Sequence, residues 1–311
     1  MKIQNYSCLL IFVCVLFSAC NDSKKTNTNT PQETVYKNVT TTAYELAQPK
    51  AETAAVLVLF GGFPEVAKDI QREFGILKTA KQHRIAVVYV NYNQKLWFEQ
   101  GELDSLSHQI QEIFTKHALP NTNVFFGGFS SGGNVALHLG NYVTKHTNFG
   151  IQPKGIFIVD SPIDLAALYR SAEKNVQRNF SDVSVQEGRF LLKMLGERFG
   201  NPAEAIEAYE KYAVFTSQTN YTDNLSGLQN TKLRFYTEPD TLWWRQQRMV
   251  DYEQMNAFYI KRLAEQLIAK NFKHVTYIST ENKGYRANGE RHPHSWSIVD
   301  KEELIRWMLD Y

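Results

Sequence analysis

The sequence predicts an α/β fold built on a mostly parallel central sheet with helices on both of its faces. Continuous apolar runs at 54–60, 85–90 and 155–159 alternate with segments of helical periodicity, such as 103–119 and 250–270. Apolar runs without polar alternation are typical of strands that are covered on both faces, as in parallel sheets. Strands that alternate with helices in this way indicate an open parallel sheet. The 311 residues are enough for one large domain.

The N-terminal residues have the pattern of an export signal. Lys2 supplies a positive charge, and the apolar run 9–17 is too short to span a bilayer as a retained helix. The run ends in small residues before Cys20, and this ending resembles a bacterial lipobox. The resemblance implies that 1–19 is a lipoprotein signal peptide and that Cys20 carries the lipid. The mature protein would then be exported and anchored to a bacterial membrane. Asn21 favours the outer membrane, because it is not the aspartate associated with inner-membrane retention.

The segment that begins at Cys20 is expected to be a flexible tether. Residues 20–33 are mostly polar, so they cannot bury enough surface to offset their chain entropy. The three cysteines are Cys8, Cys14 and Cys20, which leaves the expected folded domain, 34–311, without a disulfide or a thiol nucleophile. The formal net charge is +2 and there is no long basic stripe, which argues against nucleic acid as a partner.

The individual elements are predicted from local patterns, in chain order. Residues 34–46 alternate apolar and polar positions, which suggests one or two edge strands. Asp300 is expected to cap the last helix, with Glu303 three residues later. The strands between are expected at 54–60, 85–90, 124–126, 155–159, 233–236 and 275–278, and the helices at 66–77, 103–119, 134–139 and 250–270.

One interval interrupts the alternation of strands and helices. Residues 161–231 have helical periodicity but contain no good strand candidate. Because this interval follows one sheet strand and precedes the next, it is interpreted as a helical lid inserted over the carboxyl edge of the sheet. The alternative is a set of ordinary crossover helices.

A Gly-x-Ser-x-Gly motif, Gly128-Phe129-Ser130-Ser131-Gly132, follows the apolar run that ends at Phe126. At a strand-to-helix corner this motif holds its serine on a tight turn with the side chain exposed. Ser130 is therefore the candidate nucleophile. The alternative is a simple Gly/Ser turn between two elements.

A serine hydroxyl needs a base to accept its proton. Of the eight histidines, His292 and His294 lie in a loop after the last strand and before the last helix, where the carboxyl ends of the strands meet. His294 is preferred, because Trp296 can pack beside it and fix the loop, and His292 is the alternative. A metal site at these two histidines has no third ligand that the sequence identifies, so no metal and no organic cofactor is expected.

The base needs an acid that holds its tautomer. Asp240 is preferred, because it lies a few residues beyond the strand 233–236 and on the expected edge of the sheet. Glu238 in the same loop and Asp160 at the end of the preceding strand are the alternatives.

The order Ser130, Asp240, His294 on an alternating β/α chain resembles the α/β-hydrolase superfamily over approximately residues 50–311. The run Phe60-Gly61-Gly62-Phe63-Pro64-Glu65 is similar to that family's His-Gly-Phe-Pro-Glu oxyanion loop, with Gly61 in place of the histidine. The resemblance implies that the oxyanion donors are the N–H groups of Phe63 and Ser131. Epoxide hydrolases share a similar loop but use an aspartate nucleophile, and Ser130 argues against that branch.

The expected activity is that of a serine hydrolase that cleaves a small-molecule carboxylic ester through an acyl-enzyme. Two other interpretations stay open at this point. One is a peptidase of the same fold, and the other is an inactive lipoprotein that only binds a ligand. The sequence does not predict an oligomeric state.

Overall fold

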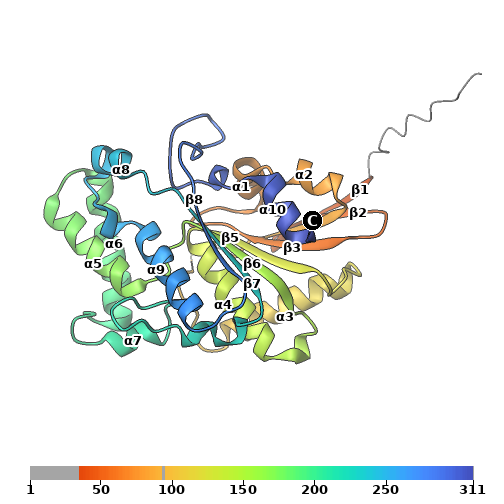
Figure 1. Cartoon of the computed structure of the whole chain (residues 1–311), viewed down its shortest axis with the longest axis horizontal. Coiled ribbons are helices and arrows are strands. Elements are labelled where there is room, and N and C mark those ends of the chain that lie inside the picture. The colour runs from red at the N-terminus through yellow and green to blue at the C-terminus, as the bar shows by residue number, and fades with distance from the viewer. Residues whose placement is uncertain (1–34, 93–94, 311) are drawn as a thin grey trace, which may run out of the picture. The chain divides into compact units, whose positions relative to one another are not determined.

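The computed structural model describes residues 35–92 and 95–310, and an eight-stranded sheet runs through them in the order β1-β2-β4-β3-β5-β6-β7-β8 (Figure 1). The first three strands of this order pair antiparallel, and all later neighbours pair parallel. The predicted mostly parallel sheet is therefore confirmed. The strands are β1 (Tyr36–Thr40), β2 (Tyr44–Pro49), β3 (Ala55–Phe60), β4 (Ile85–Val90), β5 (Val124–Phe129), β6 (Pro153–Val159), β7 (Lys232–Thr237) and β8 (Val275–Ser279).

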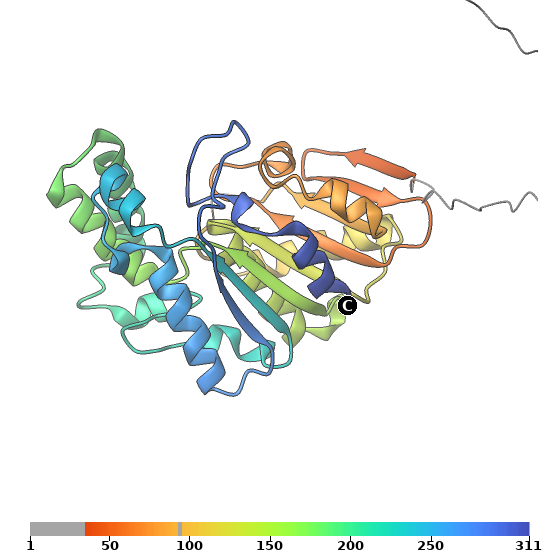
Figure 2. The same cartoon turned by 45° about the horizontal axis from the view of Figure 1, so that its top comes forward.

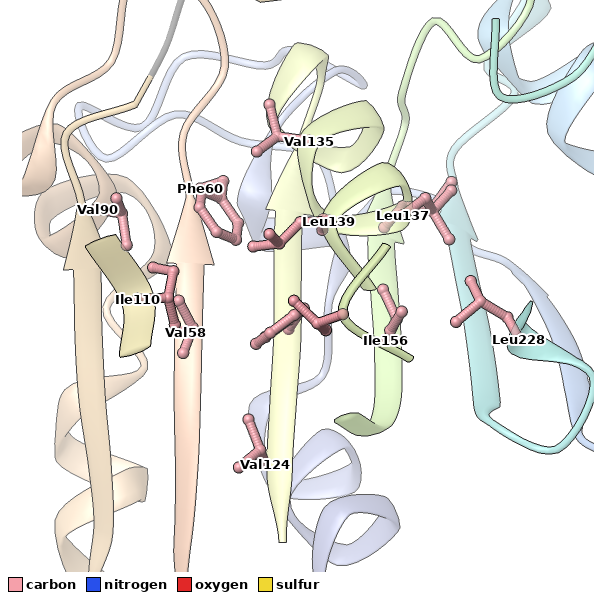
Figure 3. Close-up of a cluster of buried hydrophobic side chains, with 14 of the residues drawn as sticks. Val58, Phe60, Val90, Ile110, Val124, Val135, Leu137, Leu139, Ile156 and Leu228 are labelled. Atoms are coloured by element: carbon pink, nitrogen blue, oxygen red, sulfur yellow. The ribbon is translucent and has the colours of Figure 1, made fainter. Parts of the chain in front are cut away.

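The central strands are buried on both faces, as their continuous apolar sequences require. Every residue of β3, β4 and β5 is buried. Alternate side chains along each strand enter two separate apolar clusters, because successive strand residues point to opposite faces. Figure 3 shows one of these clusters, in which Val58 and Phe60 of β3 meet side chains of the neighbouring strands and helices.

Helices cover both faces of the sheet, also as predicted. One apolar cluster contains side chains of α3 (Glu102–Lys116), α4 (Ser131–Lys145) and α9 (Asn256–Ala269). The other contains side chains of α1 (Ala67–Phe74), α2 (Leu77–Gln82) and α10 (Lys301–Leu309). Figure 1 shows α1, α2 and α10 on one side of the sheet and α3 and α4 on the other.

Two details of the helix prediction are refined by the structure. The helix expected at 66–77 is divided, because Gly75 takes a left-handed conformation (φ 58°) and ends α1. The predicted cap of the last helix is present, since the Asp300 carboxylate accepts a hydrogen bond of 3.0 Å from the Glu303 N–H.

The interval between β6 and β7 contains helices and no strand of the sheet. Its helices are α5 (Leu165–Arg178), α6 (Asp182–Phe199) and α7 (Ile206–Glu210), and it ends in the 3₁₀ helix η2 (Asp223–Leu228). The helices α5, α6 and α7 share an apolar cluster of their own that includes Leu165, Leu195 and Tyr209. Figure 2 shows α5 and α6 beyond one end of the sheet, beside α8 (Thr241–Arg248). The helical layer at this end of the sheet therefore contains α8, which follows β7, as well as the helices of residues 161–231.

The predicted signal peptide (1–19), the lipidated Cys20 and the tether (20–33) lie outside the described residues. Within 35–92 and 95–310, the structure contains no helix with the length and apolar character that crossing a membrane requires.

Candidate active site

Ser130 occupies the corner between β5 and α4, where the sequence motif placed it. Its backbone has φ 52° and ψ −128°, a region that non-glycine residues adopt at an energetic cost. The corner is held in place because the Ser130 N–H donates a 2.9 Å hydrogen bond to the carbonyl oxygen of Val159 at the end of β6. This strained turn is the backbone geometry expected of a nucleophile at a strand-to-helix corner.

The two glycines of the motif are required by close backbone approaches. A Cβ on Gly128 would lie 2.0 Å from the carbonyl oxygen of Gly132. A Cβ on Gly132 would lie 2.3 Å from the carbonyl oxygen of Phe60, at the end of β3. No side chain fits at either position, so the turn and the neighbouring strand meet only because both residues are glycine.

The acid that contacts His294 in the structure is Asp160. The His294 Nδ1–H donates a 2.6 Å hydrogen bond to Asp160 Oδ2. Asp160 directly follows β6 with φ 45°, and its N–H donates to the carbonyl oxygen of Tyr236 at 2.9 Å. Its own carbonyl oxygen accepts a bond of 2.9 Å from Asn256 Nδ2. Backbone contacts to β7 and α9 therefore fix this carboxylate against the imidazole.

The expected contact between Asp240 and His294 is corrected by this geometry. Asp240 instead caps α8, where its Oδ1 accepts a bond of 2.9 Å from the Trp243 N–H. Its Oδ2 accepts a bond of 2.7 Å from Arg291. Both carboxylate oxygens of Asp240 thus stabilise the segment that contains the end of β7 and the start of α8.

Glu238, the other carboxylate considered in this loop, is buried and also contacts Arg291, at 2.6 Å. It accepts hydrogen bonds from the N–H groups of Lys283 and Gly284 and from the Thr280 hydroxyl. Glu238 therefore anchors the start of the loop that carries His294 rather than contacting the imidazole.

His294 lies against the nucleophile corner. Its ring is 4.5 Å from the ring of Phe129, the residue before Ser130. Trp296 packs 5.4 Å from Phe129 and stacks 4.5 Å from Phe74 of α1, so it fixes the loop as expected. No described residue makes a hydrogen bond to Ser130 Oγ.

His292 has a different environment. Its Nδ1–H donates to the carbonyl oxygen of His294 at 3.0 Å, and its ring lies 4.8 Å from the ring of Trp243. Burial, together with the positive charge of Arg286, lowers the pKa of His292 to about 3. His292 is therefore neutral near pH 7, and its contacts support the backbone of His294.

The predicted oxyanion loop, 60–65, lies directly beside Ser130. A Cβ on Gly62 would be 2.9 Å from the Cβ of Ser130. The N–H groups of Phe63 and Ser131 have no hydrogen-bond partner within the described part of the chain. Ser131 is the first residue of α4, and the first N–H groups of a helix have no partner within the helix. Both groups are therefore available to an oxyanion.

The side chain of Glu65 stabilises the predicted oxyanion loop. Its Oε2 accepts a bond of 2.9 Å from the Gly62 N–H and one of 3.1 Å from the Trp296 indole N–H. A Cβ on Gly61 would lie 2.8 Å from the Cβ of Glu65, so the absence of a side chain at Gly61 leaves room for Glu65. One carboxylate thus connects the predicted oxyanion loop to the loop that carries His294. The sequence motif contained Glu65 but gave no sign of this contact to Trp296.

Replacing Glu65 with alanine is expected to lower both stability and activity. The substitution removes an acceptor from two buried N–H groups, and each unsatisfied group costs about 1–3 kcal/mol. We expect a loss of unfolding free energy in urea denaturation and a drop in kcat of about tenfold or more, since one displaced oxyanion donor costs about 10²–10³. Glu65→Gln keeps an acceptor oxygen and is the matched control. Equal kcat values for the wild type and Glu65→Ala would contradict this role.

Two exposed aromatic side chains contact each other beside the predicted oxyanion loop. Phe63 and Phe190 of α6 are 58% and 54% exposed, and their rings are 6.4 Å apart. Leu242 of α8 is 65% exposed. Trp243 contacts both His292 and Trp244. The helical layer thus reaches the predicted oxyanion loop through the contact between Phe190 and Phe63.

A separate cavity of about 300 Å³ lies between α5, α9 and the 3₁₀ helix η3 (Tyr252–Gln254). Arg170, Lys174, Glu253 and Arg262 are among its lining residues, and Ser130, Asp160 and His294 are not. Among the described residues, no group of three or more His, Cys, Asp or Glu side chains could hold a metal ion.

Comparison with known proteins identifies the fold. No family model matches the chain, and no curated protein matches it. A solved esterase/lipase from an uncultured bacterium is similar with a TM-score of 0.54 and 13% identity, over 90% of this chain and 86% of that one. Carboxyl esterase 2 from the fungus Tuber melanosporum has a TM-score of 0.54 and 14% identity, over 91% and 88%. An esterase from the bacterial hormone-sensitive lipase family has a TM-score of 0.52 and 11% identity, over 89% and 84%.

The protein therefore has the α/β-hydrolase fold, with a mostly parallel eight-stranded sheet and helices on both faces. Identities this low establish the shared fold alone.

Proposed function

We propose that the protein is a serine hydrolase that cleaves a carboxylic ester through an acyl-enzyme, with Ser130, His294 and Asp160 as its catalytic triad. The observation that carries this proposal is the hydrogen bond between His294 and Asp160, on an imidazole that packs against the residue before Ser130. This bond uses Nδ1, which leaves Nε2 to accept the serine proton. Structural similarity to solved esterases supports the same conclusion.

In the proposed reaction, Ser130 Oγ attacks the ester carbonyl carbon while His294 Nε2 accepts the hydroxyl proton. Asp160 keeps the other ring nitrogen protonated and stabilises the imidazolium. The N–H groups of Phe63 and Ser131 donate to the oxyanion of the tetrahedral intermediate, and one such donor is worth about 10²–10³ in rate. The alcohol leaves with the proton from His294. Water, deprotonated by the same histidine, then releases the carboxylic acid and frees Ser130.

Labelling with a fluorophosphonate tests the nucleophile. We expect one covalent adduct, found by mass spectrometry on the peptide that contains Ser130, and none after heat denaturation. Ser130→Ala should lose the adduct, whereas Ser131→Ala should keep it, because that variant retains the Ser131 N–H. Absence of the adduct in folded wild-type protein would refute the proposal.

The type of bond is tested with paired substrates, 4-nitrophenyl esters and aminoacyl 4-nitroanilides. Faster turnover of the esters is expected. Preference for the anilides would indicate a peptidase of the same fold, and binding without turnover of either series would indicate a ligand-binding protein.

We also propose that residues 161–231 form a lid over the site. The contact between Phe190 and Phe63 supports this role, because it joins the inserted helices to the predicted oxyanion loop. Export and lipidation at Cys20 remain proposals that rest on the N-terminal sequence. A diacylglyceryl group on Cys20 is the expected result of mass spectrometry on protein from a bacterial membrane fraction, and an unmodified or uncleaved N-terminus would contradict it.

A further inference from the structure

A positively charged side chain, that of Arg286, lies beside the proposed catalytic residues. Its guanidinium carbon is 6.0 Å from the centre of the Phe129 ring, the same ring against which His294 packs at 4.5 Å. The guanidinium and the His294 imidazole therefore both lie near the ring of the residue that precedes Ser130. The proposed ester chemistry does not use this guanidinium.

The loop that carries Arg286 is fixed by contacts on several sides. A turn of hydrogen bonds closes its tip, from the Arg286 N–H to Glu290 and from the Gly289 N–H to Arg286. The Ala287 N–H donates to Glu73 of α1, and the Tyr285 N–H donates to Ser297. Arg286 is therefore held at this place by its backbone rather than by the contacts of its side chain.

The guanidinium has no ion pair or hydrogen bond with any residue in 35–92 or 95–310. Arg291, five residues later in the same loop, contrasts with it, because Arg291 contacts both Glu238 and Asp240. The nearby carboxylates already accept other bonds. Glu65 accepts from Gly62 and Trp296, and it lies close enough to Arg286 for that positive charge to oppose the rise of the Glu65 pKa that burial causes. Glu73 accepts from Arg72 and Ala287.

The charge around the site is consistent with an anionic ligand. Burial is the first cause of the lowered pKa of His292, and the positive charges of Arg286 and Arg248 lower it further. Two cationic groups therefore lie near His292, which itself supports His294. Arg286 is half-buried, so a bond to its guanidinium would be less screened than one in bulk water.

We propose that Arg286 binds a carboxylate group of the substrate, so that the preferred substrates are esters that carry a free carboxylate. This inference rests on the proposed ester hydrolysis. A planar guanidinium presents parallel N–H donors that match the two oxygens of a carboxylate. Arg286 is thus a specificity-determining residue that recognises a part of the substrate away from the bond that is cleaved.

Two pairs of esters of matched length test this proposal. Monomethyl adipate and methyl hexanoate differ only by a carboxylate at the end of the acyl chain, and 4-acetoxybutanoate and butyl acetate differ only by a carboxylate on the alcohol side. The measured quantity is the ratio of kcat/KM for the charged ester to kcat/KM for its neutral partner. A hydrogen bond to a charged group contributes about 1.5–3 kcal/mol, so this ratio should fall about 10- to 100-fold in Arg286→Gln for at least one pair.

Two further variants serve as references. Arg286→Lys keeps the charge without the paired donors, so it should retain part of the preference. Arg84→Gln removes an exposed arginine that precedes β4, at the opposite end of the sheet strands, and should leave the ratio unchanged. An unchanged ratio in Arg286→Gln for both pairs would overturn the proposal, even where fluorophosphonate labelling and neutral-ester turnover uphold the proposed function.

Binding to an inactive variant distinguishes a failure of carboxylate recognition by Arg286 from a failure of the proposed ester hydrolysis. Calorimetry with Ser130→Ala should show binding of a charged ester that is at least tenfold tighter than binding of its neutral partner. The double variant Ser130→Ala/Arg286→Gln should lose this difference. If the wild type hydrolyses no ester, this measurement still decides the question, because equal affinities in the two variants would refute carboxylate recognition by Arg286.

Discussion

Replacing His294 with alanine is expected to lower kcat by about 10⁵- to 10⁶-fold, because the nucleophile and its base act as a unit in serine hydrolases. His294 is the imidazole that contacts both Asp160 and the residue before Ser130. The rate of labelling by a fluorophosphonate should fall in parallel, since both reactions require the activated hydroxyl. Steady-state kinetics on an activated ester and the labelling rate provide the two measurements.

His292→Ala is the matched control, two residues away in the same loop. His292 donates to the carbonyl oxygen of His294 and packs on Trp243, so its loss should destabilise the loop by about 1–3 kcal/mol. A loss of kcat of no more than about 150-fold is expected, since 3 kcal/mol corresponds to roughly that factor. A loss as large as that of His294→Ala, in a protein that remains folded, would reverse the roles of the two histidines.

Asp160→Asn is expected to lower kcat by about 10³- to 10⁴-fold. An asparagine at this place can donate its amide hydrogens to Nδ1, which stabilises the wrong tautomer and leaves Nε2 unable to accept the serine proton. The amide has nearly the size of the carboxylate, so the thermal midpoint should change little. Kinetics and thermal unfolding of the same preparation separate loss of chemistry from loss of fold.

Asp240→Asn distinguishes the two aspartates. Asparagine can keep the cap of α8, so the loss is that of the charge that contacts Arg291, and it should cost no more than about 1 kcal/mol of stability, with a change in kcat of less than about tenfold. If Asp240→Asn caused the larger loss of activity, the assignment of Asp160 would be wrong and the sequence-based choice would stand.

Much of the fold could be predicted from the sequence because its signals are local. The apolar runs of β3 and β4 predicted strands buried on both faces, and those strands are buried throughout. Ser130 and its two glycines lie within a single turn, so the spacing of the motif was enough to find the strained corner. Each of these predictions depended on residues that are neighbours in the chain.

The choice of the acid could not be made in the same way. Asp160 and Asp240 both follow strands that are neighbours in the sheet, and Val159 pairs with Tyr236 across them. Both carboxylates therefore reach the same edge, and distance along the chain does not decide between them. Arg291, which lies 51 residues beyond Asp240, binds both Asp240 and Glu238, whereas Asp160 contacts His294. Such a contact depends on how a distant loop folds back.

The position of Asp160 has a consequence for how this protein can diversify. In the proposed triad the carboxylate that contacts His294 follows β6, so no residue of α8 has to carry a charge beside the imidazole. Asp240, Leu242 and Trp243 belong to α8 and its N-cap, and Leu242 is exposed. Substitutions there could therefore change which molecules are admitted while the reacting groups stay as they are, so that selectivity and chemistry can evolve on separate strands.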